Sequence, residues 1–256
     1  MSEIFKASIK ENKPLTENHY LLTLHPLKDI SIPQPGQFFM LSVDDSLDPL
    51  LKRPFSLHRF INGDIQILYR VVGKATKILK GKKPGDVMEV LGPLGNGFPQ
   101  DIKKDARMIF AAGGMGVAPI LALADIFSGR KPHLFYGART EKELLCIDEF
   151  RALGIDPVIS TDDGSSGKMG NIVNDIGDFL NTNPSDDYII YSCGPKPMFA
   201  ALAGLAGKYK IFAFMSLEEN MACGIGTCLG CVVQTRNGYK RVCKEGPVFS
   251  SEEIIW

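Results

Sequence analysis

The sequence predicts a β plus α/β chain, in which an N-terminal antiparallel β-barrel precedes an α/β domain with a parallel sheet and a C-terminal cysteine-rich module. Three observations lead to this fold class. Short strand-like runs separated by turn residues fill residues 1–100. From Arg107 onward, strand-like and helix-like segments alternate. Four of the six cysteines then lie between Cys223 and Cys243.

Length and composition narrow the class of protein. A chain of 256 residues favours two domains, or two domains and a small module. Its 29 basic and 29 acidic side chains give a net charge of zero, which argues against a nucleic-acid partner. The N-terminal segment MSEIFKASIKENK lacks the apolar run of a signal peptide, and no stretch approaches the ~18 apolar residues of a membrane helix. We therefore expect a cytoplasmic protein with reduced thiols and no membrane contact.

The barrel is predicted from four short runs rich in β-branched, aromatic and leucine side chains. These are HYLLTLHPL, GQFFMLSV, RPFSLHRFI and DIQILYRVV, and the turn segments IPQPG, NGD and KKPGD punctuate them. Within this part, Arg53 and Arg70 stand near the hydroxyls of Ser56 and Thr76. Guanidinium groups pair well with phosphate oxygens, so these residues suit a pyrophosphate. Taken alone the signal is weak, because arginines on barrel strands are usually solvated or ion-paired.

The α/β domain is predicted for residues 101–214. Its first strand, RMIFAAGG, leads into VAPILALADIF, whose apolar residues recur at the helical period. Gly113, Gly114 and Gly116 lie at this strand–helix turn, where backbone N–H groups and the helix N-terminus favour a phosphate group. The turn is not the G-x-G-x-x-G fingerprint, and His133 stands where an acidic residue is expected. A tight turn without a ligand is the alternative.

The cysteines of the last segment follow the pattern of a plant-type [2Fe–2S] site. Their spacing is C-x4-C-x2-C followed by a more distant cysteine, at Cys223, Cys228, Cys231 and Cys243. Gly224, Gly226 and Gly230 allow the backbone to curl around a cluster. A hairpin with an Asn237-Gly238 turn is expected to bring Cys243 back to the other three. Structural zinc and a merely buried set of thiols are the alternatives, although zinc usually takes two closely spaced pairs.

These motifs together resemble a known family. In chain order they read RPFS, LYR, GKAT, GPLGNGF, GGMGVAP, CGPKPM and SLEENMACGIGTCLGC, ending in VCKEGPVF. This order resembles ferredoxin reductase-like flavoproteins and, more narrowly, the electron transfer subunits of dihydroorotate dehydrogenase type B. The resemblance covers nearly the whole chain, and the cysteine segment is its most specific part.

The resemblance implies cofactors and residues. It implies an FAD-binding barrel over residues 1–100, a nicotinamide nucleotide (NAD) domain over 101–214 and a [2Fe–2S] module over 215–256. FAD is then held by Arg53, Pro54, Phe55, Ser56, Leu68, Tyr69, Arg70, Ala75 and Thr76. The cluster ligands are Cys223, Cys228, Cys231 and Cys243, and Gly113, Gly114 and Gly116 border NAD. The family has a Gly-Thr pair where this chain has Ala75-Thr76, so the backbone beside the FAD phosphates is expected to be less free.

The resemblance also implies a partner and a reaction. A separate FMN-containing catalytic subunit oxidises dihydroorotate in pyrimidine biosynthesis, and electrons pass from FMN to the cluster, to FAD and to NAD+. The assembly implied is a heterotetramer with two copies of each subunit. Two rival functions stay open. One is the same kind of subunit in a sulfide dehydrogenase-like or ferredoxin:NADP oxidoreductase-like complex. The other is a zinc-stabilised binding module without catalysis.

Four further residues carry weaker expectations. Asp162, in STDDGSSG, could accept a hydrogen bond from a ribose hydroxyl and so favour NAD over NADP, or could be a solvated loop acid. Cys193 follows an apolar strand at the end where α/β sheets bind ligands, or is a small buried hydrophobe. Cys146 is expected in the core, and Trp256 is expected to pack rather than to cover a flavin.

Overall fold

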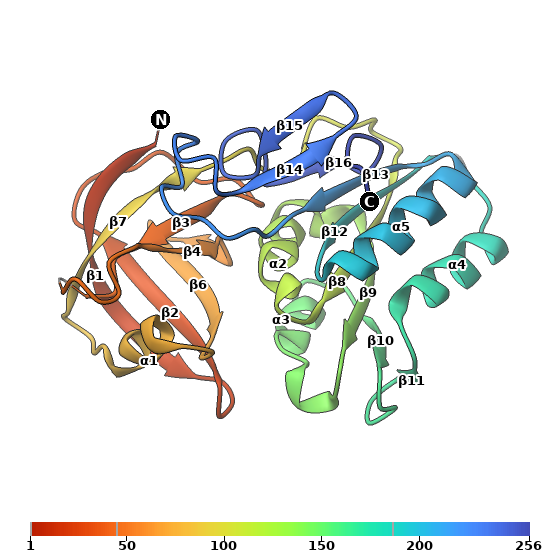
Figure 1. Ribbon diagram of the computed structural model, residues 1–256. Helices are drawn as coiled ribbons and strands as arrows, with labels where there is room; N and C mark the ends of the chain where they lie inside the picture. Colours follow the sequence, from red (N-terminus) through yellow and green to blue (C-terminus); the bar gives the residue numbers. More distant parts are fainter. Residues whose placement is uncertain (1, 45, 186) are drawn as a thin grey trace.

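In the computed structural model, two seven-stranded sheets lie side by side and the cysteine-rich segment crosses above both (Figure 1). The structure describes residues 2–44, 46–185 and 187–256. The first sheet is antiparallel and the second is mainly parallel, which confirms the predicted fold class. Among the described residues, no helix combines the length and the apolar character needed to cross a membrane.

The first sheet curls into a half-barrel around its own apolar core. Its strand order is β4-β3-β7-β1-β2-β6-β5. Strand β1 and the starts of β6 and β7 alternate accessible and buried residues, as expected of antiparallel strands with one covered face. The strands are β1 (Glu3–Pro14), β2 (His19–Pro26), β3 (Phe38–Leu41), β4 (Arg53–Ser56), β5 (Arg59–Ile61), β6 (Asp64–Arg70) and β7 (Val87–Leu94), with helix α1 (Lys74–Gly81) after β6.

The second sheet has the order β11-β10-β9-β8-β12-β13-β16. Its central strands are continuous apolar runs because helices cover both of their faces, and all six residues of β12 are buried. All neighbouring strands in it are parallel except β13 and β16, which pair antiparallel. The strands are β8 (Arg107–Gly113), β9 (His133–Ala138), β10 (Val158–Thr161), β11 (Lys168–Met169), β12 (Tyr188–Cys193), β13 (Phe212–Ser216) and β16 (Val248–Ser250).

Helices α2 and α3 lie on the side of this sheet toward the half-barrel, and α4 and α5 lie on the other side (Figure 1). Helix α2 is apolar on almost every side because the sheet and the half-barrel both cover it; Ala122 packs into the half-barrel core. Arg59 of β5 pairs with Asp125 of α2 at 2.6 Å, which joins the two parts. The helices are α2 (Val117–Phe127), α3 (Ile147–Ala152), α4 (Ile172–Thr182) and α5 (Lys196–Tyr209).

The cysteine-rich segment contains the predicted hairpin, formed by β14 (Val232–Thr235) and β15 (Gly238–Arg241). Thr235 pairs with Gly238, so the loop residues are Arg236 and Asn237, one position earlier than an Asn-Gly loop. Gly238 takes the left-handed backbone, with φ of 96°, as in a type I turn closed by a bulge.

The last strand ties this segment to the second sheet, because β16 pairs with β13 at the sheet edge. The predicted boundary between residues 214 and 215 falls inside β13, whereas the predicted boundary at residue 100 falls between β7 and β8. The three-unit division of the chain stays a prediction.

Candidate functional site

The first cavity lies against the half-barrel and has a volume of about 530 Å³. It is formed where β4 and β6 meet the start of α1, and residues of the second sheet's domain and of the cysteine-rich segment close it. All nine residues that the sequence predicts for FAD line it, namely Arg53, Pro54, Phe55, Ser56, Leu68, Tyr69, Arg70, Ala75 and Thr76. The structure therefore brings three separate sequence runs to one place, of a size suited to a bound cofactor.

A side chain of helix α1 hydrogen-bonds to backbone N–H groups at the helix's own N-terminus. The Thr76 hydroxyl accepts hydrogen bonds from the backbone N–H groups of Val72, at 2.9 Å, and Gly73, at 3.1 Å. These N–H groups belong to the N-cap residue Gly73 and to the residue before it, so Thr76 ties the helix start to the preceding segment. Ala75 is 6% exposed, so its methyl group packs inward beside the cavity. Thr76 thus shapes this end of the cavity with its hydroxyl already engaged.

The second cavity lies at the carboxyl end of the parallel strands and has a volume of about 570 Å³. The three predicted glycines line it, for different reasons. A Cβ on Gly116 would lie 2.0 Å from the carbonyl oxygen of Cys193, so only glycine allows the close approach of the two chains. Gly114 takes the left-handed backbone with φ of 53° and meets nothing within 4 Å. This turn therefore leaves open space directly before α2, as a phosphate group requires.

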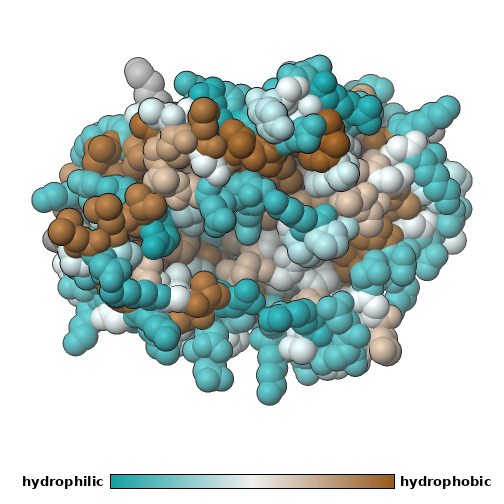
Figure 2. Space-filling model, in the orientation of Figure 1, coloured by the Kyte–Doolittle hydropathy of each residue, from teal (hydrophilic) through white to brown (hydrophobic). Residues whose placement is uncertain are grey.

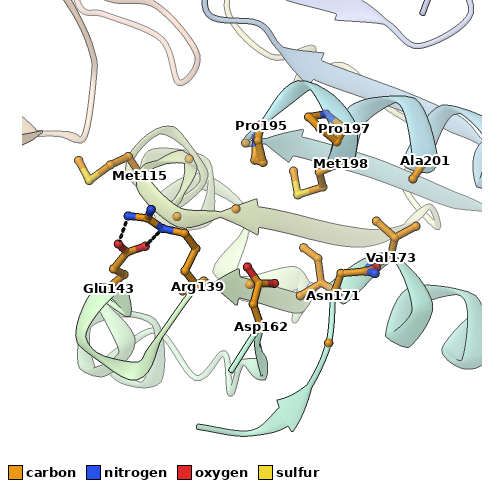
Figure 3. Close-up of a pocket in the computed structure, with 18 of the residues that line it drawn as sticks. Met115, Arg139, Glu143, Asp162, Asn171, Val173, Pro195, Pro197, Met198 and Ala201 are labelled. Carbon is orange, nitrogen blue, oxygen red and sulfur yellow. Dashed lines mark hydrogen bonds and ion pairs between the residues drawn. The ribbon is translucent and has the colours of Figure 1, made fainter. Parts of the chain in front are cut away.

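The walls of the second cavity come from several strand ends and helix starts (Figure 3). Asp162 and Asn171 lie on one side, with Met198 and Pro195 across from them. Asn171 caps α4 by accepting a hydrogen bond from the N–H of Val173 at 3.1 Å. An ion pair between Arg139 and Glu143 closes another side, and its hydrogen bonds lower the pKa of the Glu143 carboxyl.

The two cavities adjoin. Arg70, Met115 and Glu218 line both of them. Burial raises the pKa of the Glu218 carboxyl, against the opposing charge of Arg70. Sequence reasoning did not single out Glu218 or Met115. The available signal for Glu218 was its position directly after the last parallel strand, because open α/β sheets bind ligands at the carboxyl ends of their strands.

The four cysteines of the loop form two neighbouring pairs. Cys223 lies beside Cys228, and Cys231 lies beside Cys243. The N–H of Cys228 donates to the Cys223 sulfur at 3.4 Å, and the N–H of Cys243 donates to the Cys231 sulfur at 3.4 Å. Burial would raise the pKa of Cys223, but hydrogen bonds from backbone N–H groups outweigh it and lower that pKa to about 6, whereas burial raises the pKa of Cys243 to about 12. Within the described residues, no three His, Cys, Asp or Glu side chains converge as ligands of a single metal ion.

The backbone of this loop is adapted to curl around a small group. Gly224 and Gly226 take the left-handed region, with φ of 70° and 82°. A Cβ on either would lie 2.7 Å from a neighbouring side chain, of Met40 and Lys244 respectively. Gly230 does not take this region, and Leu229 takes it instead with φ of 59°. The backbone N–H groups turn toward sulfur, as iron–sulfur sites require.

The thiols of the loop differ in burial. Cys228 is exposed and Cys223 is half-buried, whereas Cys231 and Cys243 are each 2% exposed. Ile225 and Leu229, beside Cys228 in the loop, are 50% and 60% exposed. Figure 2 shows apolar surface along the top of the molecule, where Figure 1 places this segment. Met221 and Pro247 of the same segment line the first cavity, so the cysteine loop adjoins that cavity in turn.

The remaining predicted residues lie near these sites or in the core. Asp162 lines the second cavity. Cys193 is 1% exposed at the end of β12, and burial raises its pKa well above the usual range. Cys146 is buried in the core, as predicted. Trp256 packs against Phe199, and its indole N–H donates to the Ser251 carbonyl at 3.1 Å.

Comparisons with known proteins agree with this arrangement. Residues 110–203 match the family model of the oxidoreductase NAD-binding domain, and residues 218–255 match that of the iron–sulfur cluster binding domain of dihydroorotate dehydrogenase B. A solved structure of an NADH-dependent reduced ferredoxin-NADP oxidoreductase has a TM-score of 0.84 at 26% identity, over 98% of this chain and 90% of that chain. The cytochrome b5 reductase domain of Ulva prolifera nitrate reductase shares the fold, with a TM-score of 0.65 at 20% identity, over 82% of this chain and 94% of that chain.

The fold and the three adjoining sites define a ferredoxin reductase-like oxidoreductase with an iron–sulfur module. Two curated relatives, from Caldanaerobacter subterraneus subsp. tengcongensis and Geobacillus kaustophilus, are each 38% identical over 98% of both chains. Both are named dihydroorotate dehydrogenase B (NAD(+)), electron transfer subunit. The chain belongs to this family of electron transfer subunits.

Proposed function

We propose that this chain passes electrons from a dihydroorotate-oxidising catalytic subunit through a [2Fe–2S] cluster and FAD to NAD+, within pyrimidine biosynthesis. One observation carries the proposal. Met221 and Pro247, which flank the cysteine loop, line the first cavity, and Arg70, Met115 and Glu218 line both the first cavity and the second. Three adjoining sites in this order suit a relay between one-electron and two-electron carriers.

Each site has the donor chemistry that its cofactor needs. In the first cavity, Arg53 and Arg70 suit the pyrophosphate of FAD, since no carboxylate of the described residues forms an ion pair with either. FAD supplies the ability to exchange single electrons on one side and a hydride on the other. In the second cavity, the open turn at Gly114 suits the NAD phosphates. Cys223, Cys228, Cys231 and Cys243 are the proposed cluster ligands.

The pairing of the thiols supports a two-iron cluster over zinc. A structural zinc ion takes four ligands around one centre. Here the sulfurs stand as the pair Cys223 and Cys228 and the pair Cys231 and Cys243. Two pairs suit two metal centres, one for each pair. Backbone N–H groups directed at sulfur also suit a cluster, because such bonds tune iron–sulfur sites.

The exposed side of the cysteine loop is the proposed contact with the catalytic subunit. Cys228, flanked by the exposed Ile225 and Leu229, would place one ligand of the cluster at the surface that meets the FMN-containing subunit. We propose a heterotetramer with two copies of each subunit, working in the cytoplasm, where the buried thiols Cys146 and Cys193 would stay reduced.

The rival function is a reductase of the ferredoxin-NADP type, which the likeness to the reduced ferredoxin-NADP oxidoreductase favours. The second cavity argues for NAD. Asp162 projects into it, and a carboxylate accepts from a ribose hydroxyl but repels a 2′-phosphate. The identity to that structure is 26%, against 38% to the electron transfer subunits. We therefore propose NAD as the nucleotide of this chain.

The proposed division of labour predicts the activity of the isolated chain. Purified full-length chain should reduce an artificial acceptor with NADH, and should not oxidise dihydroorotate. Adding the FMN-containing catalytic subunit should give dihydroorotate-dependent reduction of NAD+, followed at the NADH absorption band. Oxidation of dihydroorotate by the isolated chain, or a colourless protein that contains stoichiometric zinc, would contradict the proposal.

The flavin assignment predicts a cofactor defect. Arg53→Ala should lower the flavin content of the purified chain several-fold, because a bidentate phosphate contact is worth ~1.5–3 kcal/mol as a charged hydrogen bond. Flavin released by heating is measured by absorbance against protein concentration. Arg236→Ala is the matched control, since Arg236 is an exposed arginine at the hairpin turn, away from the first cavity. Equal flavin content in both variants would remove Arg53 from the site.

A further inference from the structure

We propose that Arg241 and Glu245 form a charge pair that holds the cysteine loop in place, and that its two charges shift the reduction potential of the cluster in opposite directions. Arg241 anchors the loop by donating a hydrogen bond to a loop carbonyl. Its positive charge and the negative charge of Glu245 have opposite effects on the reduction potential of the cluster. The inference rests on the proposed function, because it assumes that the four thiols bind a [2Fe–2S] cluster.

The position of Arg241 places it next to both buried ligands. It is the last residue of β15 and pairs with Val232, which directly follows Cys231. It also precedes Cys243 by two residues. Its guanidinium Nη1 donates to the carbonyl oxygen of Gly226 at 2.7 Å. Arg241 therefore joins the hairpin to the part of the loop that lies between Cys223 and Cys228.

Glu245 fixes the guanidinium from the other side. Its Oε2 accepts from Arg241 Nε at 3.0 Å and from the Arg241 backbone N–H at 2.7 Å, and its Oε1 pairs with Nη2. Two parallel bonds between guanidinium and carboxylate give a defined orientation as well as energy. Both side chains are about 30% exposed, at 29% and 30%. The pair thus has one preferred geometry rather than several loose ones.

The loop conformation depends on this anchor. Gly226 takes the left-handed backbone, and a Cβ added to it would lie 2.7 Å from a carbon of the Lys244 side chain. Its carbonyl is turned toward the hairpin and accepts from the Arg241 guanidinium, which donates to no other backbone carbonyl among the described residues. Without Arg241, this carbonyl loses its charged donor and the loop loses its link to β15.

Both groups stay charged under working conditions. Arginine is always protonated in proteins. Glu245 forms a two-bond ion pair with the Arg241 guanidinium, which holds its carboxylate in the ionised form. Arg241 lies close to both buried ligands, because it is two residues from Cys243 and pairs with Val232, the residue after Cys231.

The sign of each effect follows from charge. Reduction adds one electron to the cluster, so a nearby cation stabilises the reduced form and raises the midpoint potential. A nearby carboxylate lowers it. Two other cations lie in this region. Lys240 is paired with Glu253, and Lys244 is exposed to solvent, so both are expected to act more weakly on the cluster. Arg241 and Glu245 are thus the two groups whose removal should shift the potential in opposite directions.

The test uses the full chain with its cofactors bound and measures the cluster midpoint potential by EPR-monitored redox titration, together with iron content. Arg241→Gln should shift the midpoint to more negative values, and Glu245→Gln should shift it to more positive values. The double variant should return toward the parent. Arg241→Lys should keep the parent midpoint because the charge remains. It should lose iron faster to a chelator, because a lysine ammonium cannot make the several directed hydrogen bonds that the guanidinium makes to Gly226 and Glu245.

Lys244→Gln is the matched control, since it removes one positive charge from an exposed position next to Cys243. Its midpoint shift should be smaller than that of Arg241→Gln. If Arg241→Gln does not retain its cluster, Glu245→Gln and Arg241→Lys still decide the matter. Shifts of the same sign in both glutamine variants, or an unchanged midpoint in Glu245→Gln, would overturn the inference. A parent chain without iron would instead overturn the proposed function.

Discussion

Replacing Cys243 with serine should abolish the iron–sulfur EPR signal and lower dihydroorotate-dependent NAD+ reduction by more than ~100-fold, since loss of even an outer contact at such sites costs ~10–100-fold. Cys243 is 2% exposed beside Cys231, so no solvent ligand can take its place easily. Flavin content and NADH-dependent reduction of an artificial acceptor should remain, because the two cavities do not use this thiol. The measurements are iron content, the EPR spectrum and both activities.

The control for this substitution is Cys146→Ser. Cys146 is also a buried thiol, but it lies in the core near α3, away from the loop. It should keep its iron and both activities. A Cys243→Ser chain with full iron content and an unchanged EPR spectrum would show that Cys243 is not a ligand.

Gly116→Ala should remove NADH-dependent activity and destabilise the chain by ~1–3 kcal/mol or more, the usual cost of adding atoms to a packed core. A Cβ there would lie 2.0 Å from the carbonyl oxygen and 2.4 Å from the carbonyl carbon of Cys193. Both are backbone atoms of a central strand, so they cannot rotate away as a flexible side chain could. The start of α2 must move instead, and it carries the turn that lines both cavities.

The measurements for Gly116→Ala are urea unfolding and steady-state reduction of an artificial acceptor at increasing NADH. Gly129→Ala is the control, because Gly129 has nothing within 4 Å of the added Cβ and lies outside both cavities. It should unfold near the parent and keep its activity. Parent-like unfolding and KM for NADH in Gly116→Ala would contradict the close contact with Cys193.

Much of the candidate site could be predicted because its residues lie in short, continuous runs. The four-residue run from Arg53 to Ser56 forms one strand, and Leu68, Tyr69 and Arg70 end another. The glycine turn lies between one strand and the helix that follows it. Local backbone rules act over such distances, so the residue types indicate the conformation and its chemistry. The resemblance to known flavoproteins then indicated which runs act together.

The residues that were missed depend on contacts between distant segments. Glu218 and Met115 are far apart in the chain, and only the packing of the cysteine-rich segment over both sheets brings them to the same two cavities. The return of β16 to the edge strand β13 is also a long-range pairing. An alternating or apolar pattern predicts that a strand exists, but it does not identify the strand beside it.

The sequence by itself determined the class of the two sheets, the hairpin and the cysteine spacing, because each of these follows from interactions between residues close along the chain. The tertiary structure alone decided that the three sites adjoin, that Cys228 faces solvent while Cys231 and Cys243 are buried, and that Arg241 reaches the carbonyl of Gly226. The physical reason is that burial and contact between remote segments are properties of the packed chain. They depend on the shapes of many side chains at once, whereas spacing and periodicity describe only one segment at a time.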